Sequence, residues 1–135
     1  MPRTGRAGVA RCFLSEHDHR VTELGAFVRE YIDRVVNRNE LAAVDDLLSA
    51  DYRGSGYGWP EDAEALRRFY AHQAEVRPDW TIDVQETVEV GEWVAVRALA
   101  GGTLGERRRD VEWLAAYRIS GGQVAEIHLL ALENV

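Results

Sequence analysis

Cysteine is almost absent from this chain: one residue, Cys12, occurs among 135. A single thiol excludes an internal disulfide and offers no spaced set of metal ligands. Long apolar runs are missing too, so no segment is typical of a membrane span. The basic amino terminus lacks the apolar stretch of a secretory signal. These absences predict a cytoplasmic protein that does not enter a membrane.

Clustered positive charge is also absent. The formal net charge is −7, the isoelectric point is about 5.1, and most arginines alternate with acidic residues. The one basic run, residues 107–109, is bracketed by Glu106 and Asp110, which is typical of a solvated turn between strands. We therefore expect no nucleic-acid partner and no contact with an anionic membrane surface.

Hydrophobic residues make up 46% of a chain whose length suits one domain. Residues 1–20 show no sustained periodicity and predict a flexible arm. In this arm His17, Asp18 and His19 are neighbours, and neighbouring side chains rarely converge on one ion, so we expect no metal site. Residues 21–135 are predicted to form a single domain.

Helical periodicity dominates the first half of that domain. The pattern i, i+3, i+4, i+7 predicts a long amphipathic helix with one apolar face. Its apolar residues are Leu24, Phe27, Val28, Tyr31, Ile32, Val35 and Val36.

Two shorter helices are predicted next. Asn39 is a suitable cap for a helix that runs to Leu48. Pro60 suits the first turn of a third helix, whose buried side includes Phe69, and Arg77-Pro78 ends it.

Between these two helices, residues 51–59 form a glycine-rich stretch that we interpret as a loop. No Gly-Lys-Ser/Thr follows, so the stretch is not a phosphate-binding loop. Tyr57 and Trp59 supply flat apolar surface with a polar edge. The loop is either ordinary packing or part of a pocket rim.

From Trp80 onward the period changes to two, which predicts strands. One is expected over residues 81–88 and another over residues 93–103. Two apolar runs then flank Gly121-Gly122, a strong hairpin signal because glycine reaches positive φ without steric cost. Three helices followed by about four antiparallel strands predict an α+β fold with helices on one face of a curved sheet.

Several short fragments, taken in order and spacing, carry a resemblance to a known family. They are Val28–Tyr31, Val36–Leu41, Leu48–Tyr52, Leu66–Tyr70, Arg77–Trp80, Val94–Arg97 and Tyr117–Val124. In this pattern the sequence resembles the nuclear transport factor 2-like superfamily, specifically its SnoaL-like polyketide cyclase branch, to which ketosteroid isomerase is a cousin. Residues 1–20 fall outside the resemblance.

The resemblance implies a cone-shaped, curved antiparallel sheet wrapped around three amino-terminal helices, with a deep hydrophobic cavity between them. It implies a hydrophobic, polyketide-like small molecule as the substrate, acid–base chemistry without a cofactor, and a homodimer packed through the outer face of the sheet. Such a cavity is apolar with a few placed polar groups.

The catalytic acids of the relatives do not carry over. The positions of the isomerase residues fall near Ile32, Gly56 and Ala115, and none has the required side chain. The last-strand aspartate of the cyclases falls near Leu132, with Glu133 one residue away. Because neighbouring residues of a strand face opposite sides, only a bulge would let Glu133 serve.

The last strand leaves two alternatives open. The isomerase-like register turns Ile127 and Leu129 toward the cavity. The cyclase-like register turns His128 toward the cavity instead, where it could act as a neutral base. On the preceding strand, Trp113, Ala115 and Tyr117 share one face.

The leading hypothesis is a cofactor-free and metal-free cyclase or isomerase. His128 or Glu133 would remove an acidic proton, and Tyr31 or Tyr57 would stabilise the oxyanion. The residues expected to contact the substrate are Trp59, Phe69, Trp113, Ala115, Tyr117, Ile127 and Leu129. The alternatives are an epoxide hydrolase or dehydratase of the same fold, in which Arg97 could be the arginine, and a non-catalytic binding or dimerisation module.

Overall fold

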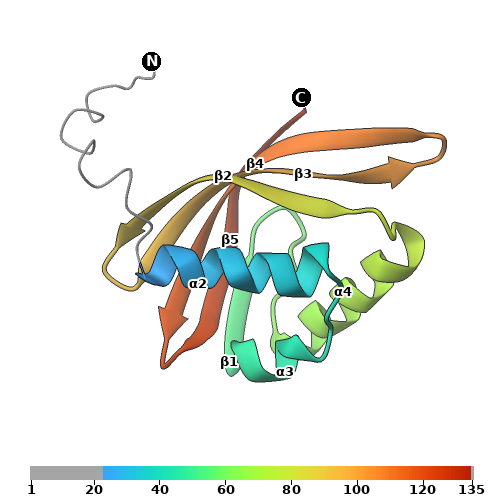
Figure 1. Ribbon diagram of the computed structural model, residues 1–135. Coiled ribbons are helices and arrows are strands. Elements are labelled where there is room, and N and C mark those ends of the chain that lie inside the picture. The colour runs from blue at the N-terminus through green and yellow to red at the C-terminus, as the bar shows by residue number, and fades with distance from the viewer. Residues whose placement is uncertain (1–22, 135) are drawn as a thin grey trace, which may run out of the picture.

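The helices lie together on one side of a curved sheet of five strands (Figure 1). The structure is a computed structural model and describes residues 23–134; the arm predicted over residues 1–20 lies outside them. Its elements run in the order α2 (Glu23–Ile32), η1 (Asp33–Asn37), α3 (Ala43–Leu47), β1 (Leu48–Ser55), α4 (Ala63–Val76), β2 (Thr81–Val90), β3 (Trp93–Leu104), β4 (Arg107–Ser120) and β5 (Gln123–Asn134). The predicted α+β class is confirmed. Within the described part of the chain, no helix is long and apolar enough to cross a bilayer.

The predicted long helix is confirmed, and its apolar face is buried. Val28, Tyr31, Val35 and Val36 are all at most 1% exposed. The last turn, η1, widens to a π-helix, in which the Arg38 amide donates to the Asp33 carbonyl five residues earlier at 2.8 Å.

The two predicted helix starts were wrong by a few residues. Asn39 takes a positive φ of 54°, which asparagine tolerates, so it turns the chain ahead of α3 instead of capping it. α4 begins at Ala63, where the Asp62 side chain accepts a 2.8 Å hydrogen bond from the Ala65 amide. Pro60 lies before this helix, and its carbonyl accepts a hydrogen bond from the Tyr52 hydroxyl.

β1 was not predicted from the sequence. Leu48 was expected in a helix and residues 51–59 in a loop, whereas residues 48–55 form an edge strand parallel to β5. The signal is weak because Asp51 and Arg53 are exposed. A charged edge strand with a glycine resembles a loop when its pairing partner is not visible in the local sequence.

The strand order is β1-β5-β4-β3-β2, and every neighbouring pair except β1 with β5 is antiparallel. Gly121 and Gly122 both have positive φ and join β4 to β5, as the hairpin signal predicted. Residues 107–109 open β4, so the turn predicted there was wrong.

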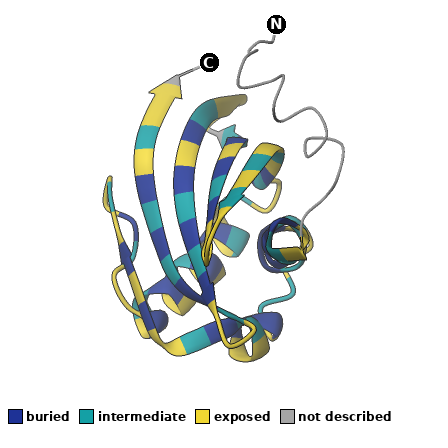
Figure 2. Cartoon of the chain, turned by 90° about the vertical axis from the view of Figure 1, so that its left-hand side faces the viewer, coloured by how far each residue is buried: buried dark blue, intermediate teal, exposed yellow. Residues whose placement is uncertain are grey.

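Two bulges in β5 decide which way its side chains face. Ile127 pairs with Tyr117 and Leu129 with Ala115, and all four side chains face the helices. The register then shifts, because Leu130 is an extra residue without a partner in β4. Figure 2 shows the resulting bands of buried and exposed residues along the strands.

After the second bulge, Leu132 pairs with the buried Trp113 and Glu133 pairs with Glu112. Leu132 therefore faces the helices and Glu133 faces away from them. The two registers that the sequence left open each describe one part of the strand.

A group of buried tyrosines joins the helices to the sheet. The hydroxyls of Tyr31 in α2 and Tyr70 in α4 lie 2.8 Å apart, and the Tyr31 ring packs edge-on against Tyr117 of β4. Burial raises the pKa of all three phenols above the ordinary value, so they stay neutral. The Tyr31 and Tyr70 hydroxyls form a structural hydrogen bond, and Tyr117 contributes its ring to the packing.

The hydrogen bond between the Tyr31 and Tyr70 hydroxyls predicts that substitutions at these two positions have non-additive effects on stability. Tyr70→Phe leaves the Tyr31 hydroxyl buried without its partner and is expected to lower the free energy of unfolding by about 1–3 kcal/mol in urea denaturation. The double variant Tyr31→Phe/Tyr70→Phe should lose clearly less than the sum of the two single losses. Tyr57→Phe, at a 62% exposed position, is the matched control and should change stability little. Additive losses would show that the hydroxyl pair contributes no coupling.

Candidate functional site

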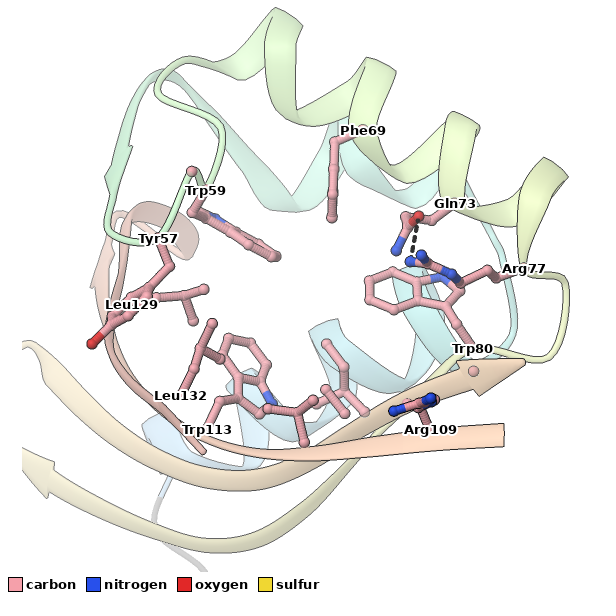
Figure 3. Close-up of a pocket in the computed structure, with 16 residues that line it drawn as sticks. Tyr57, Trp59, Phe69, Gln73, Arg77, Trp80, Arg109, Trp113, Leu129 and Leu132 are labelled. Atoms are coloured by element: carbon pink, nitrogen blue, oxygen red, sulfur yellow. Dashed lines mark hydrogen bonds between the residues drawn. The ribbon is translucent and has the colours of Figure 1, made fainter. Parts of the chain in front are cut away.

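A cavity of about 390 Å³ opens between α4, the segment after β1, and the inner face of the sheet (Figure 3). Five aromatic side chains form most of its walls. They are Tyr57, Trp59, Phe69, Trp80 and Trp113. Leu129 and Leu132 close the side formed by β5.

The aromatic rings hold one another in place. Trp59 packs against Phe69 with ring centroids 5.1 Å apart and against Trp113 at 5.8 Å. Phe69 meets Trp80 at 5.9 Å with the rings nearly perpendicular. The Trp59 indole also donates a 2.9 Å hydrogen bond to the Tyr52 hydroxyl, which fixes its orientation. The walls are therefore preformed.

A glycine pair in β3 keeps the far end of the cavity open. Gly101 and Gly102 both line it. A Cβ on Gly102 would lie 2.9 Å from the Trp80 Cβ, closer than real Cβ atoms approach. The absent side chain thus lets Trp80 pack directly on the strand.

Few polar groups reach the cavity. Gln73 is 8% exposed, and its Oε1 accepts a 3.4 Å hydrogen bond from Arg77, while Arg109 enters from β4. Among the described residues that line the cavity, none is a carboxylate or a histidine. The titratable side chains there are Tyr57, Arg77 and Arg109.

One buried donor in the wall has no partner. The Trp113 Nε1 is shielded from water and makes no hydrogen bond within the described residues. An unpaired buried N–H costs on the order of 1–3 kcal/mol.

The structure separates the residues that the sequence predicted for the site. Tyr57, Trp59, Phe69, Trp113 and Leu129 line the cavity. Ala115, Tyr117 and Ile127 face the same side but belong to the packed core, as does Tyr31.

His128 and Glu133 face away from the cavity, on the outer side of the sheet. His128 Nδ1 lies 2.7 Å from Ser55 Oγ, and its Nε2 lies 2.7 Å from Glu126 Oε1. Its ring also packs near Trp93. His128 faces outward because side chains alternate along β5 between its two bulges, and Glu133 faces outward because the second bulge resets this alternation. The sequence alone did not reveal where the bulges lie.

Arg97 also lies on the outer face. It is 3.3 Å from both Glu86 and Glu112. The arginine considered for an epoxide-opening set is therefore paired with surface carboxylates and is absent from the cavity lining.

Sequence reasoning missed Gln73, Arg77, Trp80, Arg109 and Leu132 as cavity residues. Arg77 was interpreted only as a helix end, and Arg109 as part of a solvated run. Period-two alternation back from Trp113 places Arg109 on the same face of β4, and this signal was available in the sequence.

No metal centre is apparent within residues 23–134, where no three His, Cys, Asp or Glu side chains are grouped to hold an ion. The adjacent His17, Asp18 and His19 lie outside the described residues.

The helices packed on a curved sheet around an aromatic cavity define an α+β fold with a small-molecule-sized site. The model of the SnoaL-like domain matches residues 28–127, well over half of the chain. The protein belongs to the SnoaL-like domain family, as the resemblance in its sequence predicted.

Solved structures agree with this fold. A SnoaL-like polyketide cyclase from Agrobacterium tumefaciens is 14% identical, with a TM-score of 0.69 over 83% of this chain and 92% of that one. IdmH from Streptomyces antibioticus is 21% identical, with a TM-score of 0.70 over 81% and 91%. A protein from Catenulispora acidiphila with a ketosteroid isomerase-like fold is 14% identical, with a TM-score of 0.67 over 78% and 84%. No curated protein sequence matches the chain.

The outer-face network predicts a pH-dependent contribution to stability. Hydrogen bonds from His128 first, and from Arg118 next, lower the pKa of Glu126. Because the folded-state pKa is lowered, the stabilisation is present above the ordinary carboxyl pKa and is lost as pH falls through the folded-state value. Glu126→Gln should therefore be less stable than wild type at pH 7, and the gap should narrow in acid.

Urea unfolding at several pH values measures this gap. Glu75→Gln, a change of the same charge on the exposed side of α4, is the control and should show a small, pH-independent difference. A gap for Glu126→Gln that stays constant down to strongly acidic pH would contradict the prediction.

Proposed function

We propose that the protein binds an apolar, carbonyl-bearing small molecule in the aromatic cavity and promotes its cyclisation or isomerisation without a cofactor. The observation that carries this proposal is the preformed cavity of about 390 Å³ walled by five aromatic rings. Membership of the SnoaL-like family supports the class of chemistry. Rigid aromatic walls orient a flexible substrate and bring its reacting carbons together.

The chemistry we propose begins with loss of a proton from carbon next to a carbonyl. Since the described lining residues include no carboxylate or histidine, a hydroxide ion from the solvent takes that proton and becomes water. The C–H electron pair moves to the carbonyl oxygen as an enolate. The Gln73 amide, whose nitrogen points into the cavity (Figure 3), would donate a hydrogen bond to that oxygen. In a cyclisation, the enolate carbon attacks a second carbonyl, and the alkoxide is then reprotonated.

A second candidate is a binding protein without catalytic activity. The absence of an acid or a histidine from the described lining favours it, because general acid–base catalysis usually relies on such a group inside the site. Epoxide opening has less support, since Arg97 is held on the outer face.

The bicyclic ketone 1-tetralone tests both candidates. We expect it to quench tryptophan fluorescence on binding and to exchange its α-protons with D2O faster in the presence of protein, measured by proton NMR. Leu132→Trp should weaken binding at least about tenfold by filling the cavity, and should remove the acceleration.

Leu130→Trp is the matched control, since Leu130 is the bulged neighbour and does not line the cavity. It should bind like wild type. Binding without faster exchange would favour the non-catalytic candidate, and equal losses in both variants would contradict the cavity as the site.

We also propose a homodimer through the outer face of the sheet. Val88, Val90, Trp93 and Leu114 are partly exposed apolar side chains, at least 36% exposed. All four belong to one face, because Val88 pairs with Ala95, Val90 with Trp93, and Leu114 with Arg97. Exposed apolar surface of this kind is typical of a protein interface.

Leu114→Glu tests the interface. Sedimentation velocity at micromolar concentration should give a dimer for wild type and a monomer for the variant, because a buried unpaired carboxylate is costly. Val76→Glu adds the same charge at an exposed apolar position of α4 and should remain dimeric. A monomeric wild type, or a dimer that withstands Leu114→Glu, would contradict this interface.

A further inference from the structure

Two arginines line the same end of the cavity, although they come from distant parts of the chain. Arg77 follows α4 and Arg109 lies in β4, and both line the cavity (Figure 3). Gly102 lies next to both arginines. It pairs with Arg109 across β3 and β4, and a Cβ placed on it would lie 3.5 Å from the Arg77 Cβ. The backbones of the two arginines therefore both lie beside the same glycine.

Neither guanidinium is neutralised within the described part of the chain. The Arg77 side chain donates only to the uncharged Gln73 amide, at 3.4 Å, and the Arg109 side chain has no ion pair or hydrogen bond among residues 23–134. The two acids that neighbour them in sequence are occupied. Asp79 accepts from Thr103 and pairs with Arg108, and Asp110 pairs with Arg108 at 3.2 Å.

Unpaired arginines are not the rule in this protein. Its net charge of −7 supplies ample carboxylates, and most described arginines on other surfaces have one within 3.5 Å. Within residues 23–134, these two guanidinium groups have no carboxylate partner and form a local positive field beside an apolar cavity, in a chain whose net charge is negative. Aromatic walls strengthen that field because they exclude water from one side of it.

We propose that Arg77 and Arg109 form a carboxylate-binding subsite, so that the cavity takes apolar small molecules that carry a carboxylate at the end lying between the two arginines. This inference rests on the proposed function of the cavity and specifies its ligand class. A guanidinium presents paired N–H donors that match the two oxygens of a carboxylate. Gln73 orients one guanidinium through its Oε1, and Trp80 supplies apolar surface beside both arginines.

A matched pair of fluorescent probes tests the subsite. Anthracene-2-carboxylate and anthracene-2-carboxamide have the same ring system and nearly the same shape, and they differ in charge. Wild-type protein should bind the carboxylate at least about tenfold more tightly than the amide at low ionic strength. Added salt should reduce this preference, because the subsite opens to solvent.

Arginine variants assign the preference to residues. Arg77→Gln and Arg109→Gln should each lower carboxylate affinity about three- to tenfold, and the double variant should bind the two probes equally. Amide affinity should stay unchanged in all three. Arg68→Gln is the control for net charge. It lies on the outside of α4, paired with Glu64, and should retain the wild-type preference.

The outcomes separate this inference from the proposed function. If wild-type protein binds both probes equally well, the cavity remains a site for apolar molecules and the carboxylate subsite is overturned. If neither probe binds, the cavity proposal fails and the subsite fails with it. A preference that Arg68→Gln removes as fully as Arg77→Gln would overturn the subsite too, because the effect would then come from net charge.

Discussion

The alternation of side chains along β3, β4 and β5, interrupted twice in β5, is the constraint on which the rest of the structure depends. Between the bulges, Ile127 and Leu129 face the helices and His128 faces out. Beyond the second bulge, Leu132 faces the helices and Glu133 faces out. Because Leu130 is an inserted residue, the facing of the strand changes at this point. Apolar side chains therefore face the helices, and His128 and Glu133 face outward, both before and after it.

This sorting gives the two faces of the sheet different chemistry. The outer face holds the carboxylates of the central strands, Glu112 and Glu126, where arginines and His128 pair with them. The inner face has aromatic walls, and the charged groups that reach its cavity are Arg77 and Arg109. The charges that the described residues bring to the cavity are therefore positive, which is the observation behind the proposed carboxylate subsite.

The family and the site carry different kinds of information. Membership of the SnoaL-like family accounts for the helices on a curved sheet and for the presence of a cavity. The site itself comes from the residues of this chain, and the described residues that line the cavity include no carboxylate and no histidine. Among the described residues that line the cavity, the charged side chains are Arg77 and Arg109, and Gln73 is an uncharged hydrogen-bonding group.

The sequence by itself determined the elements whose signal is local. The period of 3.6 identified the buried face that includes Val28 and Tyr31, and Gly121-Gly122 identified the hairpin. It also indicated aromatic candidates such as Trp59 and Trp113, because large rings with polar edges are recognisable at any position.

Only the tertiary structure decided the rest. β1 forms because Leu48–Ser55 pairs with a strand more than 70 residues later, and no local pattern reports such a pairing. A bulge is invisible to periodicity, since it changes the facing of every later residue without changing composition. Arg77 and Arg109 come to the same end of the cavity only when the segment that follows α4 packs against β3 at Gly102, the partner of Arg109 in β4. Contacts between distant segments depend on how the chain closes on itself, and this closure is a property of the whole fold.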